Sequence, residues 1–371
     1  MAKIWANSGD SHFLEPADLW SSSLPKDLAD RTPRSVKDED GAFETVHVDG
    51  QSFRRKLPTP KQQEFLAKSA ASKGVGDMDA RLVDLDNEGI WAEVVFPSLG
   101  MWNACFRDPK LLKEVMRVSN DWAWDTISKK SNRMVVTAQV SMLSIEDAVE
   151  ELERCANTGF RAVFLPTTPP SALPDYNRNE WEPFWAAAER ANMVVAFHIG
   201  TDPFDMSTDE IGVTFRGPGG AILNYTETTY SGQRAATKMV ASGALDRHPN
   251  LKVLISEGGA TWVPFLGDRM NEAFRQHSMS VRPQLSRPPK EILMEQVYTS
   301  FQHDETAVAA MTAMGYNNVM WGSDYPHMEG TFGHTQETLH QLFDGVEQKV
   351  VDRITQGAFF ELFPEVPRIN A

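Results

Sequence analysis

Cysteine is scarce in this chain, with only Cys105 and Cys155 among 371 residues. Two cysteines cannot build a disulfide framework or a cysteine-based zinc site, so both classes of protein are excluded. No apolar run is long enough to cross a bilayer, and residues 1–5 show no hydrophobic signal segment. We therefore expect a cytoplasmic protein.

Positive charge is also in deficit, because 36 Lys and Arg residues stand against 51 Asp and Glu residues, a formal net charge of −15. An acidic surface disfavours nucleic acid and anionic membranes as partners. It does not exclude an anionic small molecule, because a bound cation reverses the local sign of the charge. We expect a small-molecule substrate, with no nucleic-acid or membrane partner.

What the chain does contain is a recurring series of apolar runs of strand length, with helix-like segments between them. Several runs lack the alternation of a half-exposed strand, as strands buried on both faces should. They number about eight, which is the number that closes a parallel barrel. The sequence thus predicts one α/β domain over residues 1–371, a distorted (β/α)8 TIM barrel, with strands near 4–10, 91–97, 133–140, 160–165, 193–199, 251–256, 297–301 and 319–323.

Capping residues mark several of the helices between these strands. Asp108-Pro109 opens one helix, Ser144 opens another that Gly159 ends, and Gly89 ends the helix before the second strand. Further helices are predicted near 179–191, 231–246, 262–277, 304–314, 335–343 and 349–360.

Two long segments interrupt the alternation, residues 20–76 after the first strand and residues 201–229 after the fifth. Loops of this length in a compact domain are usually functional or disordered. Both follow the carboxyl ends of strands, where barrel enzymes hold their chemistry. We therefore expect both insertions to shape the pocket.

Ligand-type residues stand at the ends of three predicted strands. Asp10 and His12 are two residues apart, a spacing that points both side chains to one face of a strand. His198 ends the fifth strand and Asp324 follows the eighth. A turn-forming aspartate, a core histidine or a helix cap would account for each residue alone. Because the strands converge at one barrel mouth, the set of Asp10, His12, His198 and Asp324 predicts a divalent metal site suited to Zn²⁺ or Mn²⁺.

Longer motifs accompany these ligands: Phe197-His198, the segment 254–259 (Leu-Ile-Ser-Glu-Gly-Gly), His303-Asp304 and the segment 321–326 (Trp-Gly-Ser-Asp-Tyr-Pro). With Asp10-x-His12 and Pro264-Phe265, they make the chain resemble the amidohydrolase superfamily over nearly its whole length. The branch is that of aminocarboxymuconate-semialdehyde decarboxylase and the resorcylate and carboxyvanillate decarboxylases.

The resemblance implies that Asp10, His12, His198 and Asp324 bind one metal ion, with zinc expected before manganese. Binuclear members carry a carbamylated lysine after the fourth strand, where this chain has Pro166-Thr167 and no lysine. A single metal is therefore expected. Family members are commonly dimers or larger, so we also expect a homo-oligomer.

Glu257 departs from the resemblance, because the decarboxylases carry a catalytic histidine at this place. An arginine partner would make Glu257 structural; otherwise it is a general base, a general acid or a further metal ligand. A carboxylate base beside a metal is typical of hydrolases and hydratases. The predicted function is therefore hydrolysis of a C–N or C–C bond, or addition of water, in a small cyclic or aromatic compound.

Two alternatives stay open. The first is non-oxidative decarboxylation of an aromatic or muconate-type acid, in which Asp324 protonates the ring carbon. The second is a non-catalytic barrel that binds a small ligand, against which the intact ligand set argues.

The remaining candidates have weaker support from the sequence. His303 is a candidate catalytic residue that could instead hold its loop. His327 could contact substrate or orient Asp324. Trp102 follows the second strand and could form a wall of the pocket. The arginines that could anchor a substrate acid are Arg54, Arg55 and Arg81.

Overall fold

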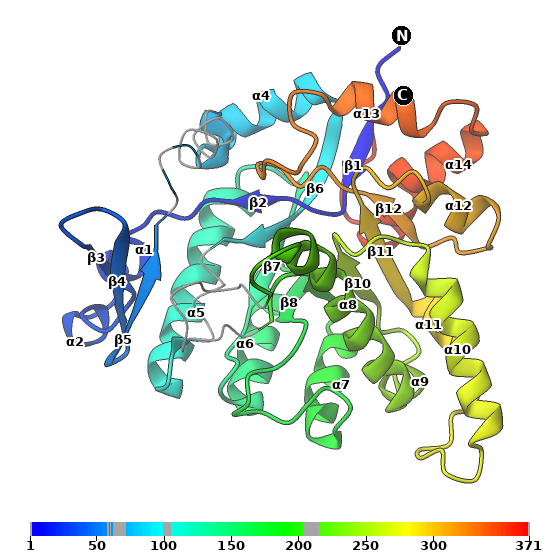
Figure 1. Ribbon diagram of the computed structural model, residues 1–371, viewed down its shortest axis with the longest axis horizontal. Coiled ribbons are helices and arrows are strands. Elements are labelled where there is room, and N and C mark those ends of the chain that lie inside the picture. The colour runs from blue at the N-terminus through cyan, green and yellow to red at the C-terminus, as the bar shows by residue number, and fades with distance from the viewer. Residues whose placement is uncertain are drawn as a thin grey trace.

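The computed structural model describes residues 2–57, 59, 61, 72–98, 105–202 and 215–369. In this part of the chain, eight parallel strands follow one another around a barrel with helices outside it (Figure 1). The predicted fold is confirmed. The strands are β1 (Ala6–Ser8), β6 (Ile90–Pro97), β7 (Met134–Gln139), β8 (Ala162–Pro166), β9 (Val194–His198), β10 (Val253–Ser256), β11 (Val297–Phe301) and β12 (Val319–Trp321).

The barrel closes between its first and last strands. The short strand β2 (His12–Phe13) continues the path of β1 and pairs with β6. The amide of Gly9 donates to the carbonyl of Trp321 over 2.9 Å, and the amide of Asp324 donates to the carbonyl of Asp10 over 2.9 Å. These bonds bring residues more than 300 positions apart into register at the barrel mouth.

Alternation along the strands separates two cores. Residues such as Val94 and Leu254 point into the barrel, whereas their neighbours Val95 and Ile255 pack against the helices. The inward cluster also contains Phe359 of helix α15 (Ala358–Leu362). This cluster includes residues from the first positions of several strands, so α15 plugs the amino end of the barrel and leaves the carboxyl end for the site.

Helices cover the outside of the barrel, and the predicted caps are present. Asp108 accepts from the amide of Lys110, Ser144 accepts from the amide of Asp147, and Gly89 ends its helix with φ 80°. The main outer helices are α4 (Met78–Glu88), α5 (Pro109–Ala123), α6 (Ile145–Thr158), α7 (Glu182–Arg190), α8 (Gly220–Ala241), α10 (Trp262–Gln276), α11 (Pro289–Gln296), α12 (Ala307–Thr312), α13 (Thr335–Leu342) and α14 (Gln348–Asp352). Among the described residues, no helix is both long and apolar enough to span a membrane.

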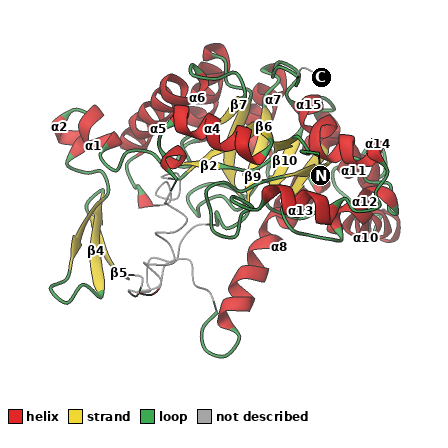
Figure 2. Ribbon diagram, turned by 90° about the horizontal axis from the view of Figure 1, so that it is seen from above, coloured by secondary structure: helices red, strands yellow, loops and turns green. Residues whose placement is uncertain are grey.

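The insertion at 20–76 holds regular structure that the sequence analysis did not predict. Three antiparallel strands, β3 (Arg34–Lys37), β4 (Phe43–Val48) and β5 (Gln51–Lys56), form a small sheet beside the barrel (Figure 2). Its inner residues pack with the short helix α1 (Leu19–Ser23) and with α5. The buried positions of β4 alternate over only six residues, too few to stand out within a polar segment.

The insertion at 201–229 is shorter than predicted, because α8 begins at Gly220 and not near Ser231. The prediction was wrong because the first turns of α8 carry exposed apolar residues, such as Ile222 and Tyr225, and do not face the core. Figure 2 shows this part of α8 projecting from the barrel.

Candidate metal centre at the barrel mouth

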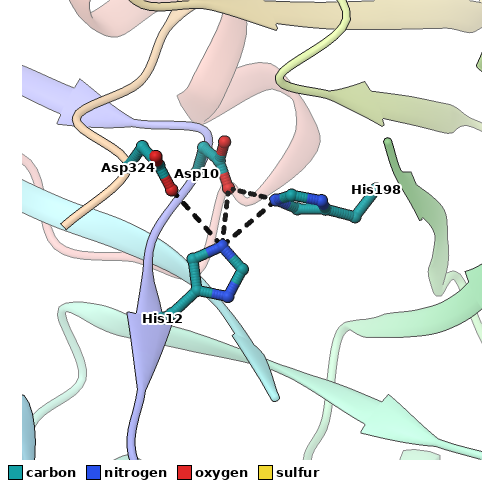
Figure 3. Close-up of side chains that lie close together, drawn as sticks. All are labelled: Asp10, His12, His198 and Asp324. Atoms are coloured by element: carbon teal, nitrogen blue, oxygen red, sulfur yellow. Dashed lines mark hydrogen bonds and ion pairs between the residues drawn. The ribbon is translucent and has the colours of Figure 1, made fainter. Parts of the chain in front are cut away.

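The structure brings together the four ligand-type residues that the sequence singled out. Asp10 lies between β1 and β2, His12 begins β2, His198 ends β9, and Asp324 follows β12. One ligand atom from each lies within 4.8 Å of the others, and all four residues are buried. Figure 3 shows their side chains pointing toward one another from separate parts of the barrel mouth.

The distances within this cluster are those of groups that converge on one point. His12 Nε2 lies 3.1 Å from His198 Nε2. Asp10 Oδ1 lies 3.2 Å from His198 Nε2, and Asp324 Oδ1 lies 3.4 Å from His12 Nε2. Two nitrogens and two carboxylates therefore surround a common space.

In the described part of the chain, the buried carboxylates of the cluster have only imidazole nitrogens as neighbours of opposite charge. All four carboxylate oxygens of Asp10 and Asp324 are buried, and none has a hydrogen-bond partner of good geometry among the described residues. Buried carboxylates of this kind are costly unless a cation or donors compensate them. Nδ1 of His198 lies 2.7 Å from the carbonyl oxygen of Ile199, a bond that would leave Nε2 free as a ligand. The residues fit a divalent metal ion with nitrogen and oxygen ligands.

The protonation of the two histidines differs. Burial and the neighbouring His327 lower the pKa of His12 to about 4, so His12 is neutral at pH 7, as a ligand must be. Burial disfavours charge on His198, but Asp10 and Glu257 outweigh burial and raise its pKa to about 10. Metal binding would have to displace that proton, so we expect metal affinity to decrease as the pH is lowered.

Glu257 lies at the edge of the cluster. It follows β10 directly in a left-handed backbone conformation with φ 60°, which is uncommon for a residue other than glycine. Its amide donates to Ser300 Oγ over 2.9 Å, and its Oε2 lies 3.7 Å from His198 Nε2. Among the described residues its ion-pair partner is this histidine and not an arginine. Burial, with the charges of Asp10 and Asp324, raises the pKa of Glu257 to about 8.

Two rim histidines have different surroundings. His327 Nδ1 lies 2.8 Å from Asp324 Oδ1, and its ring stacks on His12 with centroids 4.1 Å apart. His303 is exposed, donates from Nε2 to the carbonyl of Glu329 over 3.1 Å, and stacks on His334. The structure therefore joins His327 to the cluster and leaves His303 outside it.

The other candidates do not belong to the cluster. Trp102 lies outside the described residues. Arg55 pairs with Glu44 within the β3–β5 sheet, and Arg54 of the same sheet pairs with Asp38, which follows β3. Both views place this sheet at the side of the barrel (Figures 1 and 2). Contact of these three residues with a substrate stays a prediction.

Arg81, the third candidate for anchoring a substrate acid, is completely buried and pairs with Glu93, so it is not placed for that role. Tyr225 was missed because its segment was taken for a loop. Tyr225 is 59% exposed as a whole, but partial burial of its hydroxyl, then the charges of Glu257, Glu329 and Asp324, raise the pKa of that group to about 12.

Comparison with known proteins agrees with this geometry. The family model described as Amidohydrolase matches residues 90–358. The gamma-resorcylate decarboxylase of Rhizobium sp. (strain MTP-10005) is 23% identical over 265 residues, which are 67% of this chain and 76% of that protein. The 2-amino-3-carboxymuconate-6-semialdehyde decarboxylase of Dictyostelium discoideum is 23% identical over 294 residues, 74% of each chain.

Solved structures show the same fold at lower identity. An amidohydrolase from Mycobacterium avium subsp. paratuberculosis K-10 superposes with a TM-score of 0.77 at 18% identity, over 98% of this chain and 100% of that chain. A dihydroxybenzoic acid decarboxylase from Polaromonas sp. JS666, with bound manganese and the inhibitor 2-nitroresorcinol, gives a TM-score of 0.61 at 18% identity over 98% of each chain. The chain belongs to the amidohydrolase family and is an enzyme of that superfamily, in the branch that contains the aminocarboxymuconate-semialdehyde decarboxylase.

Proposed function

We propose that the chain is a metal-dependent carboxy-lyase that removes CO₂ without oxidation from an aromatic or muconate-type acid. The observation that carries the proposal is the buried Asp10, His12, His198 and Asp324 cluster, with Glu257, whose pKa is raised, beside it. Curated relatives of the same branch are named as decarboxylases of such acids. They favour this alternative over the hydrolysis that Glu257 first indicated.

The four clustered residues would hold one ion, which we propose to be zinc or, second, manganese. A bound divalent cation would supply the positive charge that anchors a substrate carboxylate and a neighbouring oxygen. That charge would offset the local excess of carboxylates, which otherwise repels an anionic substrate.

In the reaction the bond between a substrate carbon and its carboxylate breaks, CO₂ leaves, and the electron pair stays on that carbon, which is a ring carbon in an aromatic acid. That carbon then needs a proton. We assign its delivery to Asp324, whose Oδ1 can receive a proton from His327 Nδ1 2.8 Å away. Because the pKa of Glu257 is raised, its protonated form could donate a hydrogen bond to a substrate oxygen, as a histidine would in its place.

The second candidate is addition of water or hydrolysis, and the identity of Glu257 is the observation that favours it. An ionised Glu257 would accept a proton from an attacking water molecule. The two candidates differ in product, because only the carboxy-lyase releases CO₂.

The test has two parts. Elemental analysis should find about one zinc or manganese ion per native chain, lost in Asp10→Ala and in Asp324→Ala. The matched control is Asp304→Ala, which removes an exposed acid outside the four-residue cluster and should keep the metal. The native protein is then assayed on ring-hydroxylated benzoic acids and amino- or carboxymuconate acids, with CO₂ measured directly.

Release of CO₂ that requires the metal would establish the carboxy-lyase. A product with added water and no CO₂ would establish the second candidate instead. A native chain that holds no metal and does not respond to added zinc or manganese would contradict both.

A further inference from the structure

We propose that Arg81 is a positioning residue that holds two of the four metal ligands in place from behind the site. The proposal rests on the metal binding in the proposed function, but not on the reaction. Arg81 lies on α4, and its side chain is 0% exposed. An arginine so deeply buried needs partners for its donors, and those partners identify its role.

The first partner is the backbone of a ligand. Nη1 of Arg81 donates to the carbonyl oxygen of His12 over 2.8 Å. Nε donates to Glu93 Oε2 over 2.8 Å, and Glu93 is itself fully buried on β6. The rigid, planar guanidinium group therefore connects the backbone of His12 to the side chain of Glu93 on β6.

The second partner is the residue next to another ligand. The guanidinium carbon of Arg81 lies 4.5 Å from the centroid of the Tyr325 ring. Tyr325 follows Asp324, whose left-handed backbone, with φ 52°, leaves little freedom to readjust. The amide of His12 also donates to the carbonyl of Tyr325 over 2.6 Å. One buried cation thus contacts both segments that carry His12 and Asp324.

The hydroxyl of Tyr325 is anchored as well. It donates to Asp84 Oδ2 over 2.8 Å and lies 3.0 Å from Ser72 Oγ, at the end of the first insertion. Gly74 packs against this group so closely that a Cβ there would lie 2.6 Å from the Tyr325 hydroxyl and 2.8 Å from Arg81 Cα. The hydroxyl end of Tyr325 is therefore closely packed.

These contacts make a prediction about affinity that differs from a general effect on stability. Loss of the guanidinium would leave the His12 carbonyl and Glu93 buried without a donor and would remove the group that faces the Tyr325 ring. His12 and Asp324 would then be held less well before the metal binds. Outer partners of metal ligands typically affect affinity by about 10- to 100-fold.

The experiment measures the dissociation constant for Zn²⁺ or Mn²⁺ by competition with a chelator, well below the melting temperature of each variant. Arg81→Met should weaken binding about tenfold or more, and Arg81→Lys should restore part of the loss.

The matched control is Arg133→Met. Arg133 also donates to backbone carbonyls, those of Trp91 and Ile90, and lies over the Trp91 ring at 4.6 Å. These partners carry no metal ligand, so the control should melt earlier and keep the native affinity.

Native affinity in Arg81→Met, or an equal loss in Arg133→Met, would overturn the proposal. If Arg81→Met does not fold, Tyr325→Phe replaces it as the test, because this variant removes only the anchoring hydroxyl. Weaker metal binding in Tyr325→Phe supports the proposal, and unchanged binding contradicts it. A native chain that binds metal but releases no CO₂ would contradict the proposed function without contradicting this inference. A native chain without metal affinity would overturn both.

Discussion

His327 Nδ1 lies 2.8 Å from Asp324 Oδ1, so a histidine at the rim forms an ion pair with a buried carboxylate of the metal centre. Burial alone would lower the pKa of His327, but Asp324 raises it above its ordinary value. The pair connects the interior of the site to the rim, and it offers a path for the proton that the proposed reaction consumes.

Replacement of His327 by phenylalanine tests this path. Phenylalanine keeps a ring that can stack on His12 but has no proton to pass to Asp324. We expect kcat for CO₂ release to fall about 100-fold, with the metal content unchanged. His334→Phe is the control, because His334 is an exposed histidine that stacks on His303 outside the cluster. A native kcat in His327→Phe would exclude the proton path.

Two replacements at Glu257 separate the two candidate reactions. Glutamine cannot act as a base but can still donate a hydrogen bond. If Glu257 acts as a neutral donor, Glu257→Gln should keep kcat within about tenfold of the native value, while Glu257→Ala loses about 100-fold. If Glu257 is the base of a hydrolase, both variants should lose about 100-fold or more. Equal and native activity in both variants would remove Glu257 from the mechanism altogether.

The stability of the small β3–β5 sheet should depend on the side chain of Asp49. Its Oδ2 accepts from the amides of Arg107 and Asp108 over 2.6 and 2.7 Å, and its Oδ1 accepts from Arg31. We expect Asp49→Asn to lower the free energy of local opening of the sheet by about 2 kcal/mol, measured by hydrogen exchange of the β4 amides. Asp38→Asn is the control, because the more exposed Arg54–Asp38 pair should contribute about 0.5 kcal/mol or less.

The same carboxylate predicts a pH dependence. Burial raises the pKa of Asp49, but the amides of Arg107 and Asp108 and the Arg31 guanidinium outweigh burial and bring the pKa below its usual value. A carboxyl group with a lower pKa in the folded state stabilises that state above its unfolded pKa. Protection of the β4 amides should therefore be full at pH 7 and decline below about pH 4. Protection in Asp49→Asn that declines just as steeply would contradict this assignment.

Helix α15, which closes the amino end of the barrel, should contribute to the stability of the fold. Phe359 is 1% exposed and belongs to the inward cluster. Phe359→Ala should lower the free energy of unfolding by about 3 kcal/mol or more, as measured by urea denaturation. Phe265→Ala is a matched control, because Phe265 is 64% exposed on α10 and should change stability by about 0.5 kcal/mol at most. Equal effects of the two substitutions would mean that α15 does not close the barrel.

Much of the barrel could be predicted from the sequence because its signals are local. A buried strand such as β9 is a continuous apolar run, and caps such as Ser144 and Gly89 mark helix ends through bonds to their immediate neighbours. The four ligand-type residues were found for the same reason, since each ends or follows an apolar run. Their convergence then follows from the rule that parallel barrel strands meet at one mouth.

The small sheet and the first half of α8 could not be predicted in this way. Strand β4 buries its residues in a small cluster that includes α1 and α5, and the exposed turns of α8 show no apolar stripe toward the core. Their local sequences lack the periodicity by which strands and helices are recognised.

The sequence by itself determined the barrel, its eight strands and the identity of the four residues that could bind a metal, because strand periodicity and capping act between near neighbours. Only the tertiary structure decided that Glu257 meets His198 rather than an arginine, that His327 joins the cluster while His303 does not, and that Arg81 faces His12 and Tyr325 from behind the site. These relationships join side chains far apart in the chain. Their distances depend on the closure of the barrel and on backbone angles at single residues, which no local pattern encodes.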